Sequence, residues 1–188
     1  MRMKELTDDG YHIIYMDECG FSTKTILNSD YSPLKTNHCI PMEMVNQPVY
    51  SLVLAISYEN GVEHYEIFKK CIDENIFMSY LDDLSIANKH HKVALFMDNL
   101  SSHKTLKVRM KMQELGIEPI YSVPYFPDIN PTECCFSKIK GYYKRKKLNL
   151  LLNGKQMEMR DLVVESVNQL TIKDVQNFIK LSSKFLNK

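Results

Sequence analysis

Residues 92–98 read KVALFMD, a short apolar run that ends in an acid. Its length predicts a buried β-strand, because helices in globular proteins usually span ten or more residues. Residues 11–17 (YHIIYMD) follow the same plan and are rich in β-branched and aromatic side chains. We expect both segments to be strands of one sheet, each ending in a carboxylate, Asp98 or Asp17.

The remaining elements are expected on both sides of these strands. Residues 49–57 and 62–68 predict a hairpin closed by a turn at Glu59-Asn60-Gly61. Helices are expected over 74–88, 103–115, 131–147, 155–169 and 173–186, and a strand over 117–123. Residues 1–10 are expected to form a loose tail and residues 18–48 an irregular segment. A hairpin followed by alternating helices and strands predicts an α/β domain with a mixed five-stranded sheet flanked by helices.

Composition narrows the class of protein. The chain has 188 residues with 24 basic and 23 acidic side chains, which fits one globular domain with a net charge of +1. No apolar stretch is long enough to span a bilayer, and no secretory signal is visible at the N-terminus. The five cysteines form no C-x-x-C pair, which favours reduced thiols over a zinc site. We expect an intracellular protein, nuclear in a eukaryote or in the cytoplasm and nucleoid of a bacterium.

Asp17 and Asp98 share one context, the carboxyl end of an apolar strand. Ligands of open α/β sheets bind at such ends, so the two acids lie side by side if their strands are parallel neighbours. Two close carboxylates repel each other and need a cation, and Mg²⁺ is often held by one or two carboxylates plus a substrate phosphate. Strand context alone leaves open that each aspartate only starts a turn. Glu18 would point to the opposite face of its strand and is not counted as a ligand.

Glu133 stands in a helix-start signal. Asn130 suits the N-cap, Pro131 the first helical position, and Glu133 the acidic position of a capping box. Helix initiation alone therefore explains this glutamate, and its local context does not favour catalysis. Asp128 in the same loop is expected to serve a turn.

Three motifs, in a fixed order along the chain, favour a shared catalytic role for these acids. They are YMDECGF at 15–21, LFMDNLSSH at 95–103, and VPYFPDINPTE at 123–133, followed by Lys140. Together they resemble the catalytic domain of mariner-superfamily transposases, including bacterial insertion-sequence relatives. That family carries D-E-x-x-F, D-N-x-x-x-H and P-Y-S-P-D-x-N-P-x-E elements. Thirty-four residues separate Asp98 from Glu133, the spacing typical of its glutamate branch.

The resemblance covers about residues 11–150 and shows three departures. Phe126 replaces the usual serine, and Cys134-Cys135-Phe136 stands where the family often has a tryptophan. Neither change removes a metal ligand. Only about ten residues precede the first strand, so we expect the N-terminal helix-turn-helix modules of relatives to be absent from this chain. We expect a tail at 1–10 and a catalytic domain at 11–188, as an isolated, truncated or domesticated product.

The resemblance implies a ribonuclease-H-like fold and an Asp-Asp-Glu triad of Asp17, Asp98 and Glu133 that holds two Mg²⁺ ions, with Mn²⁺ as a substitute. Two metals about 3.5–4 Å apart stabilise the entering and leaving oxygens of an in-line displacement. The implied function is DNA strand cleavage and strand transfer in cut-and-paste transposition, by a homodimer acting on transposon ends and target DNA. Two alternatives stay open: a domesticated, non-catalytic DNA- or partner-binding domain, and another ribonuclease-H-like nuclease acting on RNA or junctions.

A basic run follows Glu133. Seven basic residues and no acid lie between Cys134 and Met157, whereas residues 59–83 carry seven acids and two lysines. The near-zero total charge therefore hides a polarised chain, and the run could lead DNA phosphates toward the metals through sequence-independent contacts. A solvated helix face is the alternative, and His103 is either a phosphate contact or a polar helix-start residue. The expected DNA-binding residues are His103, Lys138, Lys140, Lys144, Arg145, Lys146 and Lys147.

Overall fold

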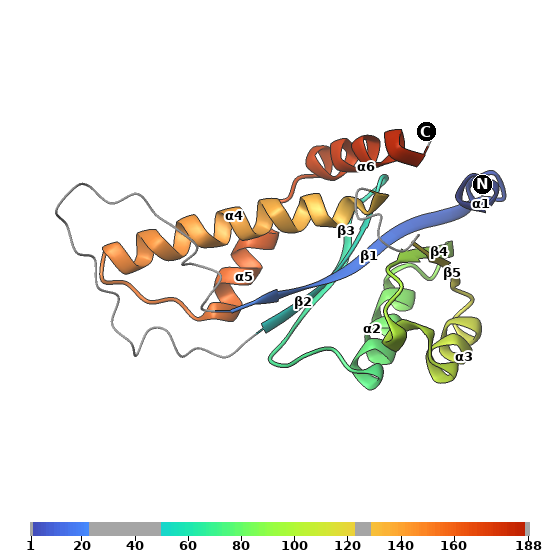
Figure 1. The fold of residues 1–188 in the computed structure, drawn as a ribbon, viewed down its shortest axis with the longest axis horizontal. Helices are drawn as coiled ribbons and strands as arrows, with labels where there is room; N and C mark the ends of the chain where they lie inside the picture. The colour runs from blue at the N-terminus through green and yellow to red at the C-terminus, as the bar shows by residue number, and fades with distance from the viewer. Residues whose placement is uncertain (1, 23–49, 123–128, 187–188) are drawn as a thin grey trace.

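A five-stranded mixed sheet organises the molecule, in the order β3-β2-β1-β4-β5 (Figure 1). The computed structural model describes residues 2–22, 50–122 and 129–186. The strands are β1 (Tyr11–Phe21), β2 (Tyr50–Ser57), β3 (Gly61–Phe68), β4 (Lys92–Met97) and β5 (Glu118–Tyr121). β1, β2 and β3 pair antiparallel, whereas β1, β4 and β5 pair parallel. The predicted mixed sheet of five strands is confirmed.

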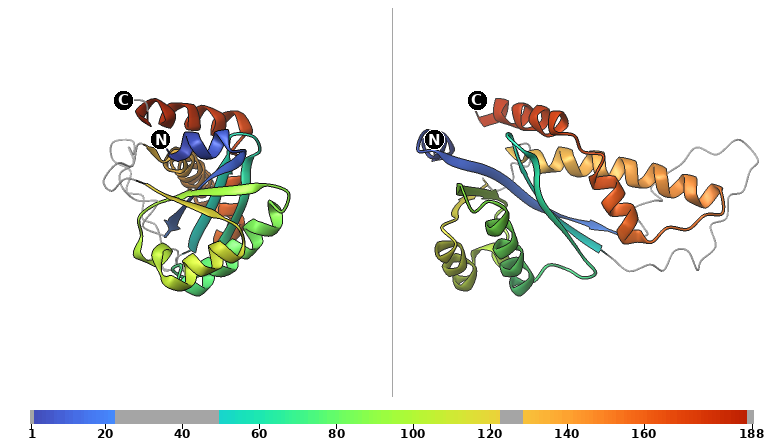
Figure 2. Two further views of the ribbon diagram at one scale, coloured as in Figure 1. Left: turned by 90° about the vertical axis from the view of Figure 1, so that its right-hand side faces the viewer. Right: turned by 180° about the vertical axis from the view of Figure 1, so that it is seen from behind.

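Helices cover both faces of this sheet (Figures 1 and 2). They are α1 (Arg2–Asp8), α2 (Glu74–Ala87), the 3₁₀ turn η3 (Ser101–Lys104), α3 (Leu106–Glu114), α4 (Pro131–Leu152), α5 (Met159–Val167) and α6 (Ile172–Leu186). α2 and α3 pack on one face, and α4, α5 and α6 pack on the other. None of the helices in the described ranges combines the length and the apolar character that a membrane span requires.

Two hydrophobic cores follow from the alternation of side chains along each strand. Ile14 and Met16 of β1 face the core shared with α2 and α3, whereas Tyr15 and Cys19 face the core shared with α4, α5 and α6. β2 is buried at every position, which explains why residues 50–57 are apolar without alternation. The sheet is thus the middle layer of three.

β1 is longer than its apolar pattern predicts. It continues past Asp17 to Phe21, because antiparallel pairing with β2 extends to Phe21↔Tyr50 after parallel pairing with β4 stops at Tyr15↔Phe96. The expectation that Asp17 ends its strand is therefore wrong, since Asp17 lies inside β1. Asp98, in contrast, directly follows the last residue of β4.

The N-terminal segment is not the loose tail that its polarity suggests. Residues 2–8 form α1, which ends before Gly10 at a φ of 79°. Leu6 is buried in the core on the α4 side, and the Tyr15 hydroxyl donates a 3.5 Å hydrogen bond to the Met3 sulfur. One apolar residue and one cross-contact dock this short helix on β1.

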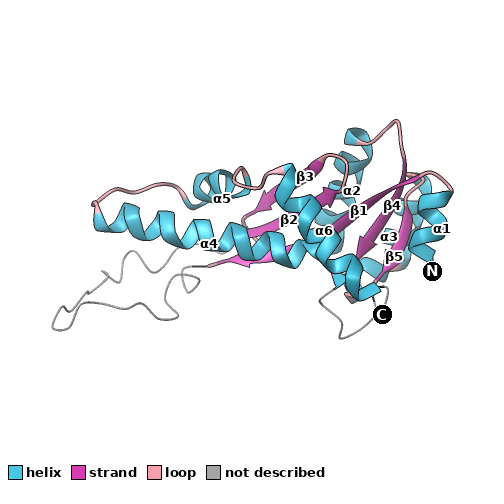
Figure 3. Ribbon diagram, turned by 90° about the horizontal axis from the view of Figure 1, so that it is seen from above, coloured by secondary structure: helices cyan, strands magenta, loops and turns pink. Residues whose placement is uncertain are grey.

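The C-terminal half departs from prediction mainly in its helix bounds. α4 runs for 22 residues to Leu152, five beyond its predicted end, and its C-terminal end extends beyond the strands (Figure 3). The helix predicted over 103–115 begins as η3 and restarts as α3, capped by the Thr105 side chain. Of the irregular segment expected over residues 18–48, residues 18–21 belong to β1, and residues 23–48 lie outside the described residues, as does the loop 123–128 with Phe126 and Asp128.

Candidate active site

Asp17 and Asp98 lie on neighbouring parallel strands. The β1–β4 register pairs Tyr15 with Phe96, and each aspartate comes two residues after that pair. The two carboxylates therefore stand next to each other at the carboxyl end of β4, the edge where α/β sheets bind ligands. The condition on which the sequence argument depended, that the two strands are parallel neighbours, is met.

The start of α4 docks on Asp17. One carboxylate oxygen of Asp17, Oδ1, accepts a 2.7 Å hydrogen bond from the Glu18 backbone N–H. The other, Oδ2, accepts from Asn130 Nδ2 at 2.8 Å and from the Thr132 hydroxyl at 3.3 Å. Asn130 is also the N-cap of α4, because its side-chain oxygen accepts from the Thr132 N–H. One capping residue thus both starts the helix and orients the carboxylate.

The charge on Asp17 is poorly compensated. Burial and, to a smaller extent, the charges of Asp98 and Glu133 raise its pKa to about 7, although hydrogen bonds from Glu18 and Thr132 partly oppose this. Glu133 itself stands exposed in the first turn of α4. A buried carboxylate that faces two other acids is stabilised by a bound cation. The donor set, three carboxylates, fits hard divalent ions such as Mg²⁺.

Lys140 belongs to the same electrostatic environment. The pKa of the Cys19 thiol is raised to about 12, mainly by burial. Three nearby charges also act on this thiol: Lys140 lowers its pKa, and Asp17 and Glu133 raise it. Lys140 lies seven residues after Glu133 on α4, two helical turns along one face. The ammonium group of Lys140 therefore stands on the site's side of α4.

His103 is buried between two carboxylates. It is 1% exposed, and its ring packs on Phe77 with centroids 4.4 Å apart. Nδ1 lies 2.9 Å from Asp98 Oδ1, an ion-pair contact without good hydrogen-bond alignment, and Nε2 lies 3.1 Å from Glu18 Oε1. Burial lowers its pKa, but the contacts with Asp98 and Glu18 outweigh this and raise the pKa to about 9. The sequence analysis predicted either a phosphate contact or a polar helix-start residue, and neither describes a buried, positively charged histidine.

Asp98 and Asp17 consequently have opposite electrostatics. Burial acts to raise the pKa of Asp98, but the His103 contact and the Leu100 N–H at 3.2 Å lower it below its ordinary value. Asp98 is thus held ionised by the protein, whereas Asp17 is not. Glu18 points away from Asp17, as predicted, yet it belongs to this network through His103. Glu18 and His103 both stand in the motifs D-E-x-x-F and D-N-x-x-x-H, but nothing in the sequence indicated that their side chains meet.

The basic residues of α4 do not form one surface. Lys138 pairs with Asp174 of α6, and Lys146 lies 2.8 Å from Glu165 of α5. Lys147 is 8% exposed, its ammonium lies 3.5 Å from the Tyr143 hydroxyl, and burial lowers its pKa. The expectation that Lys147 lies on a surface is therefore wrong. Lys144 and Arg145 are exposed and Lys140 is partly buried.

Solved structures share this fold. The chain superposes on Mos1 in "Crystal structure of the Mos1 Strand Transfer Complex" with a TM-score of 0.65 and 17% identity, covering 98% of this chain and 56% of that one. The catalytic domain of Mos1 mariner transposase gives a TM-score of 0.63 at 17% identity, covering 98% and 85% of the two chains. A simian T-cell lymphotropic virus intasome chain gives 0.59 at 16% identity, over 84% and 47%. The fold is ribonuclease-H-like, as the resemblance implied.

A family profile supplies the assignment that structure alone does not. The profile described as "DDE superfamily endonuclease" matches residues 12–150, which is most of the chain and includes all three acids and both ends of their spacing. No curated protein matches the sequence. The span of the match leads to one conclusion: this chain belongs to the DDE superfamily of endonucleases.

Proposed function

We propose that the chain is the catalytic domain of a metal-dependent DNA transposase that cleaves and joins DNA strands by cut and paste. Asp17, Asp98 and Glu133 are its catalytic triad and hold two Mg²⁺ ions, or Mn²⁺ in their place. The observation that carries the proposal is the electrostatics of Asp17, whose pKa is raised to about 7 by burial and by the other two acids. A bound cation would offset the charges of Asp98 and Glu133 that act on this largely buried carboxylate.

The bound ions would activate water or a DNA 3′-hydroxyl and stabilise the leaving oxygen. The protein's own part is to orient the ligands. Asn130 and Thr132 hold one oxygen of Asp17, and His103 contacts one oxygen of Asp98. These contacts would orient the two aspartates as ligands for the ions.

The substrate and assembly are inferred from similarity. Mos1 structures are described as paired-end and strand-transfer complexes, and the Mos1 catalytic domain has been solved with Mn and with Mg. The chain spans 56% of the length of the Mos1 chain in the strand transfer complex. We therefore propose transposon ends and target DNA as substrates, a homodimer as the active form, and phosphate contacts from Lys140, Lys144 and Arg145.

The test is nicking of a duplex that carries the transposon end, with Mg²⁺ or Mn²⁺. Asp98→Ala should lower the nicking rate by roughly 1000-fold, because it removes a ligand worth several kcal/mol of transition-state stabilisation. Asp82→Ala, a surface acid of α2, is the matched control and should leave the rate unchanged. Nicking that survives Asp98→Ala would sink the proposal. A wild-type chain that neither nicks DNA nor binds a divalent ion would favour the domesticated binding domain.

A further inference from the structure

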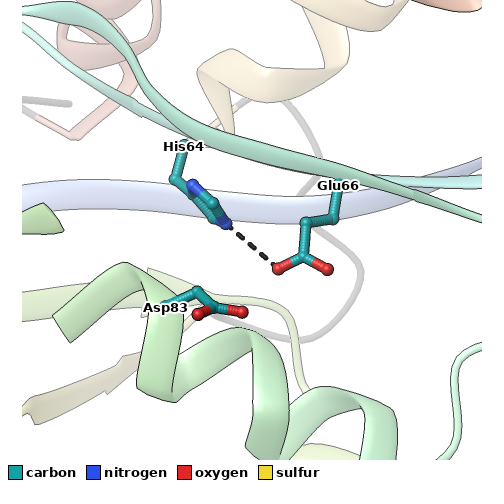
Figure 4. Close-up of side chains that lie close together, drawn as sticks. All are labelled: His64, Glu66 and Asp83. Carbon is teal, nitrogen blue, oxygen red and sulfur yellow. Dashed lines mark hydrogen bonds and ion pairs between the residues drawn. The ribbon is translucent and has the colours of Figure 1, made fainter. Parts of the chain in front are cut away.

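A second group of potential metal ligands lies outside the triad, where α2 packs against β3. His64 and Glu66 of β3 and Asp83 of α2 each offer one ligand atom, and these atoms all lie within 4.8 Å of one another (Figure 4). His64 Nε2 is 3.1 Å from Glu66 Oε1 and points toward the two carboxylates. The three side chains come from two elements and converge on one point.

The backbone explains this convergence. His64 and Glu66 are two residues apart on a strand, so their side chains leave the same face of the sheet. That face is the one that α2 covers, and Asp83 reaches it from the helix. The imidazole of His64 packs on the buried Tyr80 ring with centroids 5.1 Å apart, and the Tyr80 hydroxyl donates to the His64 carbonyl at 3.3 Å. Packing therefore restrains the histidine in a position that a metal can use.

The charge at this point is not balanced by the protein. Within the described parts of the chain, neither Glu66 nor Asp83 forms an ion pair with a lysine or an arginine. The neighbouring Asp82, in contrast, lies 2.7 Å from Lys111 Nζ. Two carboxylates beside one imidazole thus carry a net negative charge whenever the imidazole is neutral. A cation would relieve this repulsion.

We propose that His64, Glu66 and Asp83 bind one divalent transition-metal ion of the Zn²⁺ or Mn²⁺ class. An imidazole nitrogen with two carboxylate oxygens suits such ions, whereas Mg²⁺ prefers oxygen ligands alone. Three protein ligands leave positions for water, so the ion would be accessible. The site differs in this from the triad, whose donors are all carboxylates.

The two sites are separate: Asp17 faces the start of α4, whereas His64 and Glu66 lie on the opposite face of the sheet, which α2 covers. The strand registers align Glu18 with Val53 and Val53 with Glu66, so Glu66 lies two strands from Glu18, about 10 Å away at ordinary strand spacing. An ion bound there would tie β3, the edge strand, to α2. We therefore expect it to stabilise the fold and to leave the triad's own ligands untouched.

The experiment removes the triad first, so that it does not depend on the proposed function. In a chain carrying Asp17→Asn, Asp98→Asn and Glu133→Gln, calorimetric titration with Zn²⁺ should still show one saturable site per chain. Adding Asp83→Asn should weaken this binding at least tenfold, and adding Asp82→Asn should not change it. Mg²⁺ at millimolar concentration should not displace the Zn²⁺. Asp83 is exposed, and Asp82 is partly exposed and loses only its ion pair with Lys111, so neither change threatens folding.

Two further readouts separate this site from zinc capture by cysteine. Co²⁺ bound by nitrogen and oxygen ligands lacks the strong thiolate charge-transfer absorption, and saturating Zn²⁺ should raise Tm by roughly 5 °C. His64→Gln should abolish both the Co²⁺ spectrum and the Tm rise. The proposal is overturned if the triad-free chain binds no Zn²⁺ saturably, if Asp83→Asn and Asp82→Asn bind equally, or if the Co²⁺ spectrum shows thiolate.

Discussion

Asp17 should cost the metal-free protein stability, and Asp17→Asn should recover it. The folded-state pKa of Asp17 is raised from an ordinary value of 3.8 to about 7. A raised acid pKa means that the folded protein holds the proton more tightly than the unfolded chain does. Stability is therefore lost as pH rises from about 4 to about 7, and the full penalty applies above pH 7. Asparagine has no charge and avoids the penalty.

The magnitude follows from the shift and the contacts. Three pKa units correspond to about 4 kcal/mol at roughly 1.4 kcal/mol per unit, an upper value because water still reaches part of Asp17. The new amide group would face the Asn130 amide, so one hydrogen bond of about 1 kcal/mol is lost. We expect a net gain of about 2 kcal/mol at pH 8, which for this chain length is roughly a 6 °C rise in Tm.

The assay is thermal and urea unfolding of wild type and Asp17→Asn in EDTA, at pH 8 and again near pH 4.5. The advantage of the variant should be present at pH 8 and shrink toward zero at the lower pH. Millimolar Mg²⁺ should stabilise the wild type and not the variant. Asp82→Asn is the control, since it loses only a surface ion pair and should cost up to about 1 kcal/mol.

Two results would refute this reasoning. If Asp17→Asn is no more stable than wild type at pH 8 in EDTA, the carboxylate is not strained by burial and by its acidic neighbours. If the gain is the same at pH 8 and pH 4.5, it arises from packing and not from charge. Either outcome would also weaken the case that this position needs a cation.

Three further changes have defined outcomes. Glu18→Gln should lower the pKa of His103 from about 9, as NMR titration of the metal-free protein can follow, because a neutral partner replaces a carboxylate. Asn130→Ala should cost about 1–2 kcal/mol in urea unfolding, since it removes the cap of α4. Lys140→Ala should weaken DNA binding for all sequences and lower the salt slope by about 1, whereas Lys147→Ala should destabilise the fold and leave that slope unchanged.

The sequence was sufficient for the sheet and for the pairing of two acids. Apolar runs 11–17 and 92–98 predicted the strands that bring Asp17 and Asp98 together, because burial on both faces leaves a continuous pattern that is easy to recognise. It was not sufficient for the length of β1, which depends on pairing with β2. Nor did it reveal α1, where one buried leucine in a polar stretch gives no helical period.

The His103 network was beyond sequence reasoning for a different reason. His103 joins Asp98, five residues earlier, to Glu18, 85 residues earlier, and the contact exists only because β1 and β4 are neighbours. A histidine near a helix start has several ordinary explanations, and none of them requires a partner on another strand. The buried cation is a property of the tertiary structure.

Lys147, in contrast, could have been placed from the sequence. Residues spaced four apart share a stripe of a helix, and the stripe containing Lys147 is otherwise apolar. Its other members, all buried against the sheet, are Cys135, Ile139 and Tyr143. In the sequence, Lys147 follows directly on Lys144, Arg145 and Lys146, so it was grouped with these basic residues and not with the apolar stripe.

The same four-residue spacing divides the remaining charged residues of α4 into two further stripes with different surroundings. A second stripe turns toward α5 and α6, where its side chains pair with acids; it contains Lys138, Tyr142 and Lys146. The third begins at Glu133 and continues through Lys140 and Lys144. Only this stripe leads from a triad acid along a surface that the described part of α5 and α6 does not neutralise. If α4 guides DNA, its contacts should therefore follow the line from Glu133, and charge removal at Lys138 or Lys146 should loosen the helix packing before it affects DNA.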